Sequence, residues 1–255
     1  NLQKGALTMS LAEISLGAAV KRQFLFKMKA KIDVYSSLMI MQLLAFAISY
    51  GDRIRYAVRD EIFLSKVYYY SVDPVIGITI FWGLVTGITV LTKGYTDTDF
   101  TFVTNRLSST LSNILFLAAV GLAGAIMAML SKNVILLVAL FVDKADVLYG
   151  SPMTAGDFFL GTAVVFLYVS LACAIGYFIG ALVKLNKIFV FLIPALLIGS
   201  LMFDAAQDQW PLLFKVYEFY FHEFSLAIFV VKVLASIILC YLASFLILNR
   251  MEIRS

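Results

Sequence analysis

Long uncharged stretches of apolar residues dominate this chain, separated by short polar segments. A helix that crosses the roughly 30 Å hydrocarbon core of a bilayer needs about 20 predominantly apolar residues. The apolar stretches are continuous, unlike the alternating ten-residue segments of a membrane β-barrel, so they indicate helices. The six predicted spans are Val34–Tyr50, Val75–Leu91, Leu111–Leu130, Phe158–Val183, Ile188–Phe203 and Ser225–Leu248.

A shorter apolar stretch, Val134–Val142, follows the third span after a polar interruption of Ser131, Lys132 and Asn133. Its nine residues are too few to cross a bilayer alone. We expect this stretch to continue the third helix beyond the membrane or to lie on the surface. A seventh span is the alternative.

The segment Ser10–Lys31 combines apolar residues at helical spacing with a cluster of cations. This pattern predicts a helix along the cytoplasmic interface, with apolar side chains in the lipid and cations among the phosphates. An ordinary solvated helix is the alternative. The cations expected at the membrane interface are Lys21, Arg22, Lys27, Lys29 and Lys31.

Two segments on the opposite side also have a distinctive composition. Gly51–Asp73 contains the sequence VYYY, whose tyrosines are typical of an interfacial aromatic belt. Asp204–Phe224 contains QWPLLFKVYEFYFHEF, which is too apolar for an exposed loop and too charged for a span. We expect a short re-entrant or surface-lying hairpin there, before the last span.

Composition excludes a soluble fold. Hydrophobic residues make up 62% of the 255 residues and charged residues 14%, with a mean hydropathy of +0.95. A soluble domain has roughly 45–50% apolar and about 25% charged residues. We therefore expect one all-α membrane domain over residues 1–255, with six transmembrane helices. The net charge of +4 lies mostly in the N-terminal arm and indicates lipid headgroups rather than nucleic acid as the partner.

The distribution of Lys and Arg between the loops predicts the orientation. With the N-terminus in the cytoplasm, inner segments contain twelve of the twenty Lys and Arg residues and outer segments contain seven, while Lys232 lies within the sixth span. We therefore expect a multi-pass protein with both termini in the cytoplasm.

Few residues suggest chemistry. The chain has one histidine, His222, so an HExxH zinc site is excluded, and no G-x-x-x-x-G-K-[ST] phosphate-binding loop occurs. Lys232 is the one ionisable group within a span, and no acidic residue of the spans can pair with it, so we expect it to extend towards the outer headgroups. Cys173 and Cys240 fall within spans and are expected to be packing residues.

Two G-x-x-x-G pairs occur within the spans, Gly83 with Gly87 and Gly176 with Gly180. Such pairs allow two helices to approach closely. The sequence leaves open whether the approach is within one chain or between two chains.

The polar stretch Thr92–Thr110 connects the second and third spans on the cytoplasmic side. We expect a short helix parallel to the membrane, capped at its N-terminus by Asp97 and Asp99. A solvated loop is the alternative. Its apolar side chains, available to a partner outside the lipid, are Phe100, Phe102 and Val103.

This layout resembles the permease subunits of type-2 ATP-binding-cassette (ABC) exporters. In that family an elbow helix precedes six spans, and Ser10–Lys31 is similar to it. The sequence DTDFTFVTNRLSS, Asp97–Ser109, is similar to the coupling helix between the second and third spans. KLNK at residues 184–187 matches the tight inner turn, and QWPLLFKVYEFYFHEF the short re-entrant helices. FVTNRLSSTLSNILFL, Phe102–Leu117, resembles Gram-positive bacterial members.

The resemblance implies a bacterial plasma-membrane protein that forms half of an export pathway with a second permease subunit, identical or different. It implies no enzymatic activity in this chain, because ATP and Mg would bind a separate nucleotide-binding ATPase subunit. The alternatives are an ATP-independent secondary transporter or channel, and an accessory subunit that transports nothing. The residues implied to contact the ATPase are Asp97, Asp99, Phe100, Phe102, Val103, Thr104, Asn105 and Arg106.

Overall fold

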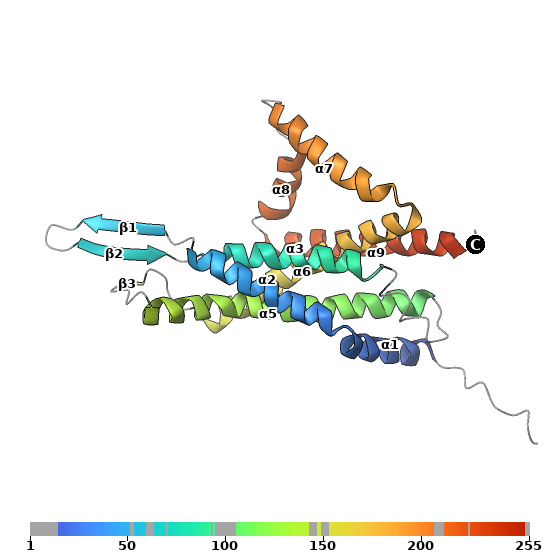
Figure 1. Ribbon diagram of the computed structural model, residues 1–255, viewed down its shortest axis with the longest axis horizontal. Coiled ribbons are helices and arrows are strands. Elements are labelled where there is room, and N and C mark those ends of the chain that lie inside the picture. The colour runs from blue at the N-terminus through green and yellow to red at the C-terminus, as the bar shows by residue number, and fades with distance from the viewer. Residues whose placement is uncertain are drawn as a thin grey trace, which may run out of the picture.

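The computed structural model is mainly α-helical, with one small β-sheet (Figure 1). It describes residues 15–51, 54–59, 64–69, 71–92, 94, 106–142, 147–148, 153–206, 212–223 and 225–252. The helices are α1 (Leu16–Ala30), α2 (Ile32–Gly51), α3 (Asp73–Thr89), α5 (Arg106–Val142), α6 (Ala155–Leu185), α7 (Phe189–Ala206), α8 (Leu212–Phe221) and α9 (Leu226–Glu252). The strands are β1 (Ile54–Arg59), β2 (Leu64–Tyr69) and β3 (Val147–Leu148).

Four helices, α2, α5, α6 and α9, are long and apolar enough to cross a membrane. They correspond to the first, third, fourth and sixth predicted spans. The helices at the second and fifth predicted spans, α3 and α7, are apolar but shorter. The described fold is therefore mainly helical, with four helices suited in length and composition to a membrane, and a total of six spans stays a prediction.

Helix α5 contains 37 residues and is about 55 Å long, well beyond the hydrocarbon thickness. The stretch Val134–Val142 continues this helix, which was one of the two expected arrangements. Ile135 and Ala139 are buried there and pack against Phe46 and Tyr50 of α2. The additional turns thus belong to the packed bundle.

Local sequence specifies where α3 and α6 begin. Pro74 occupies the first turn of α3, where its missing N–H is not needed. At the start of α6, Thr154 and Asp157 form a capping box. The Asp157 N–H donates to the Thr154 hydroxyl at 3.2 Å, and the Thr154 N–H donates to the Asp157 carboxylate at 3.3 Å. These bonds satisfy donors that a helix N-terminus otherwise leaves open.

Helices α3 and α6 cross so closely that glycine is required at their contact. A methyl group at Gly87 would collide with the carbonyl oxygen of Cys173, and one at Gly176 would collide with that of Leu84. Both predicted G-x-x-x-G pairs therefore serve packing within one chain.

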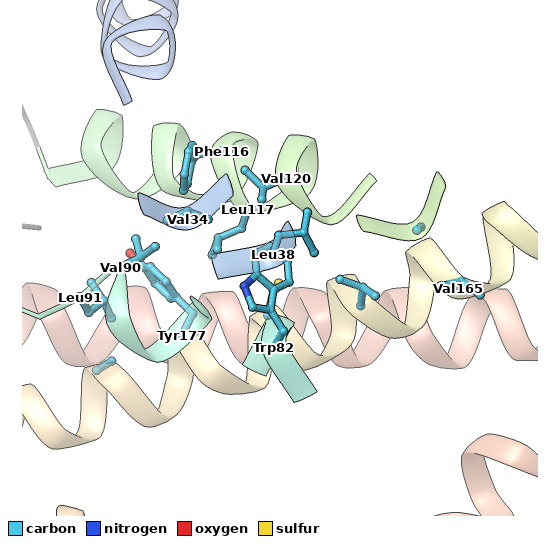
Figure 2. Close-up of a cluster of buried hydrophobic side chains, with 14 of the residues drawn as sticks. Val34, Leu38, Trp82, Val90, Leu91, Phe116, Leu117, Val120, Val165 and Tyr177 are labelled. Atoms are coloured by element: carbon cyan, nitrogen blue, oxygen red, sulfur yellow. The ribbon is translucent and has the colours of Figure 1, made fainter. Parts of the chain in front are cut away.

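The main hydrophobic core joins α2, α3, α5, α6 and the last turns of α9. Figure 2 shows Leu38 of α2 next to Trp82 of α3, with Leu117 of α5 close by. The Trp82 indole N–H donates to the Ser37 hydroxyl at 3.0 Å. This bond matters because a polar group is costly to bury without a hydrogen-bond partner.

Two strands of the small sheet, β1 and β2, lie within the predicted outer segment Gly51–Asp73, and the sheet was not expected from the sequence. Strands β1 and β2 pair antiparallel, with Ile54 opposite Tyr69 and Arg59 opposite Leu64, and β3 pairs parallel with β2. Two of the tyrosines assigned to an aromatic belt, Tyr68 and Tyr69, thus lie in strand β2, and Tyr70 lies outside the described residues.

Different elements lie at the two ends of the bundle (Figure 1). Helix α1, the end of α3, the start of α5, the turn between α6 and α7 and the end of α9 gather at one end, and the sheet projects from the other. Helices α7 and α8 lean away from the bundle as a V-shaped pair. Helix α8 lies in the segment where a short hairpin was predicted.

Candidate functional site

Buried polar side chains line the contact between α1 and α5. On the α1 side, Gln23 and Lys27 are four residues apart, so they lie on one face of the helix, and Lys31 follows at the same interval as the residue that caps its C-terminus. All three are buried, although Lys27 and Lys31 are cations; Lys27 is only 1% exposed. On the α5 side, Ser112 and Asn113 are buried as well.

Lys27 is the centre of this contact. Its ammonium group donates to the Ser112 hydroxyl at 2.8 Å and to the Asn113 side-chain oxygen at 2.6 Å. The Asn113 amide nitrogen in turn donates to the Tyr177 hydroxyl of α6 at 3.4 Å. We call Lys27, Ser112, Asn113 and Tyr177 the Lys27 network.

Two neighbours extend the polar face of α1 in both directions. The Lys31 ammonium lies 5.3 Å from the ring centre of Phe116, within the range of a cation–π interaction. The Gln23 amide, one turn before Lys27, has no hydrogen-bond partner among the residues that the structure describes. The face that α1 turns towards the protein therefore includes two cations and an amide next to the apolar residues Val20, Phe24 and Met28.

The five cations predicted for the membrane interface fall into two groups. Lys21, Arg22 and Lys29 are exposed, as a contact with headgroups requires, and that contact stays a prediction. Lys27 and Lys31 are buried against α5 instead. The four-residue spacing of Gln23, Lys27 and Lys31 was the available signal, but it does not distinguish a polar face in water from one inside a protein.

The predicted ATPase contact lies mostly outside the described residues. Asp97, Asp99, Phe100, Phe102, Val103, Thr104 and Asn105 all belong to the part of the chain that the structure does not describe. Arg106 is the first residue of α5 and is half-buried. Its guanidinium donates to the carbonyl oxygen of Leu248 in α9 at 2.5 Å. The charge expected to face a partner therefore also connects two helices of its own chain.

Lys232, in the second turn of α9, has an acidic partner that was not predicted from the sequence. Its ammonium lies 2.9 Å from the Glu223 carboxylate and 4.3 Å from the ring centre of Phe219. Glu223 precedes the predicted sixth span by two residues, so a search within the spans could not find it. The pair offsets the cost of an isolated charge at this position.

The end of α8 is also attached to α6 and α9 by hydrogen bonds. The Tyr168 hydroxyl of α6 donates to the backbone oxygen of Tyr220 at 2.9 Å. The Tyr220 hydroxyl and the Ser236 hydroxyl of α9 are 2.8 Å apart. Together with the ion pair, these contacts attach the C-terminal end of α8 to α6 and α9, whereas most large apolar side chains of α7 are exposed.

Within the described ranges no three His, Cys, Asp or Glu residues group in a way that could hold a metal ion. Comparisons with protein-family models, with curated proteins and with solved structures find no match for this chain.

Proposed function

We propose that this chain is the membrane subunit of an ATP-driven ABC exporter, in which it forms half of the translocation pathway and acts with a separate ATPase subunit. The main support for the proposal is how the helix ends are arranged at the end of the bundle that contains α1 (Figure 1). The end of α3 and the start of α5 meet there, and Arg106 connects that start to α9. An ATPase acting on the connection would therefore displace the first turn of α5 directly.

Three further features support this function. Helix α1 is cationic and precedes the first apolar helix, as an elbow helix does in the family that the sequence resembles. The turn between α6 and α7 is tight, with the Ile188 N–H donating to the Asn186 side-chain oxygen at 3.0 Å. Helix α8 has ten residues and lies directly before α9, in the place of a short re-entrant helix.

The proposed function also implies a cellular location and partners. The exposed cations Lys21, Arg22 and Lys29 suit the anionic inner leaflet of a bacterial plasma membrane, so both termini would face the cytoplasm. ATP and Mg would bind the ATPase subunit. A second permease subunit, identical or different, would complete the pathway.

Co-purification tests the proposal. The tagged full-length chain, extracted from native membranes, is expected to bring down an ABC-type ATPase identified by mass spectrometry. Phe102→Ala is expected to lose that ATPase, because buried aromatic side chains dominate interface energetics. Phe191→Ala is the matched control, since Phe191 is 79% exposed on α7. An ATPase that is absent from the wild-type sample, or retained by Phe102→Ala, would contradict the proposal.

An ATP-independent secondary transporter is the second candidate function, and the ion pair of Lys232 with Glu223 favours it. Ionisable side chains within a span often mark an ion pathway, and Lys232 lies within the sixth predicted span. In vesicles that contain the purified chain alone, a secondary transporter would move its substrate with an ion gradient, and Glu223→Gln would abolish the movement. A chain that is inactive without an ATPase would exclude this candidate.

A further inference from the structure

Helix α1 is attached to the bundle by a buried cation. A lysine at a membrane surface normally extends its ammonium to water or headgroups, because a buried charge is costly unless it is hydrogen-bonded. Lys27 is 1% exposed and has two acceptors on neighbouring residues of α5, at 2.8 and 2.6 Å. Charge-assisted bonds of this kind are stronger and more directional than apolar contacts.

The attachment continues beyond α5. Asn113 accepts a bond from Lys27 through its oxygen and donates one to Tyr177 through its nitrogen. Tyr177 is fully buried in the main core, and its ring centre lies 5.5 Å from that of Tyr241 in α9. The Lys27 network therefore reaches from α1 through α5 to α6, where it meets α9.

We propose that Lys27 is a positioning residue that makes α1 move together with α5 and α6. Helix α1 is then a part of the moving bundle, while its exposed cations Lys21, Arg22 and Lys29 contact the lipid. The link is a property of the chain by itself, and its use in transport rests on the proposed function. Arg106 lies less than two turns before Ser112 and Asn113 on α5, so a displacement at the start of α5 would reach α1 through Lys27.

Distances between spin labels test the link in the full-length chain in lipid nanodiscs. Labels replace Arg22 of α1 and Leu185 of α6, which are both exposed, in a background with Cys173→Ala and Cys240→Ala. The wild-type network is expected to give one narrow distance distribution. Lys27→Met is expected to widen this distance distribution by about 5 Å, which corresponds to a shift of α1 along α5 by one helical turn. Lys29→Gln, an exposed cation two residues away, is the control and should leave the distribution unchanged.

Lipid composition separates this link from attachment by headgroups. The distribution is expected to be the same in nanodiscs with anionic phosphatidylglycerol and in nanodiscs with phosphatidylcholine alone, because Lys27 is bound to protein. A width that depends on anionic lipid and not on Lys27 would overturn the proposal. Equal distributions for Lys27→Met and Lys29→Gln would also overturn it.

A milder variant keeps the test decisive if Lys27→Met does not fold. Tyr177→Phe removes the hydroxyl that accepts from Asn113 and retains the buried ring. The distance from Arg22 to Leu185 should then broaden, while the distance from Arg22 to Leu107 on α5 stays narrow. If both distances keep their wild-type widths, the network does not link α1 to α6 and the proposal fails.

A transport measurement on the complex with the ATPase tests whether the link is used in coupling. Lys27→Met is expected to retain the ATPase and to lose most of the transport per ATP hydrolysed, and Lys29→Gln to retain both. Full transport by Lys27→Met would contradict a role of the link in coupling. A wild-type chain without an ATPase would instead contradict the proposed function, and the label distances would still report on the link.

Discussion

The guanidinium of Arg106 donates a hydrogen bond to the carbonyl oxygen of Leu248, which lies 142 residues later in the chain. The bond joins the first residue of α5 to the last turns of α9, close to the C-terminal end of that helix. A cation is favourable there because the helix dipole is negative at its C-terminus. The Leu248 side chain is buried in the main core, so Arg106 connects the segment before α5 to the packed interior.

Replacing Arg106 is therefore expected to affect stability as well as any partner contact. Arg106→Ala should lower the free energy of unfolding by about 1 kcal/mol, because it removes a charge-assisted hydrogen bond that is only half-buried. Thermal unfolding of the detergent-solubilised chain measures the change. Arg250→Ala is the control, since Arg250 is an exposed cation on α9. Equal effects of the two substitutions would mean that the Leu248 contact contributes nothing.

Because α3 and α6 approach closely at glycine, the effect of a glycine-to-alanine substitution on stability should depend strongly on its position in α3. Gly87→Ala should destabilise the protein by at least about 1–3 kcal/mol, because its methyl group would meet backbone atoms that cannot rotate away. Gly77→Ala on the same helix should be neutral or stabilise the protein by up to about 1 kcal/mol, since a methyl group there meets no atom within 4 Å and alanine favours a helix over glycine. The melting temperatures of the two variants provide the comparison, and similar values would refute the close crossing.

The bond between Lys27 and Asn113 can be measured by a double-mutant cycle. Asn113→Leu alone should cost about 1–3 kcal/mol, because it removes an acceptor from a buried ammonium. Lys27→Met combined with Asn113→Leu should cost less than the sum of the single substitutions, since apolar groups then replace both partners. Strictly additive costs, measured by thermal unfolding, would show that the two residues do not interact.

The ion pair between Lys232 and Glu223 should contribute modestly, because both side chains are about a quarter exposed. Glu223→Gln is expected to lower stability by about 0.5–1 kcal/mol, and the loss should shrink as salt is added. Glu218→Gln, at an exposed position on α8, is the control. If Glu223→Gln and Glu218→Gln lower the free energy of unfolding equally at low salt, the ion pair does not stabilise the protein.

Labelling of introduced cysteines tests the orientation. Gly51 is the last residue of α2 and Gly94 follows α3; both are exposed, and they lie on opposite sides of the membrane in the expected topology. In intact cells an impermeant thiol reagent should modify Gly51→Cys and should not modify Gly94→Cys. Permeabilised cells, in which both should react, are the control. Modification of Gly94→Cys from outside would reverse the topology.

The sequence was sufficient to predict a mainly helical fold and the positions of the four long apolar helices. The predicted span Phe158–Val183 lies within α6, and the predicted continuation Val134–Val142 is part of α5. These features are local, because a long apolar run in lipid must satisfy its backbone groups within the segment, and only a helix does so. Capping residues and Pro74 act on neighbouring residues and are equally visible in the sequence.

Tertiary structure decided which polar groups meet. Lys27 and Ser112 are 85 residues apart in sequence, and nothing in the composition of Ser10–Lys31 shows that Lys27 turns inward while Lys29 stays exposed. An amphipathic pattern specifies two faces of a helix, but the packing of α1 on α5 determines which face is covered. The acidic partner of Lys232 depended in the same way on how α8 and α9 come together, because a side-chain pair forms only after the fold has brought its elements into contact.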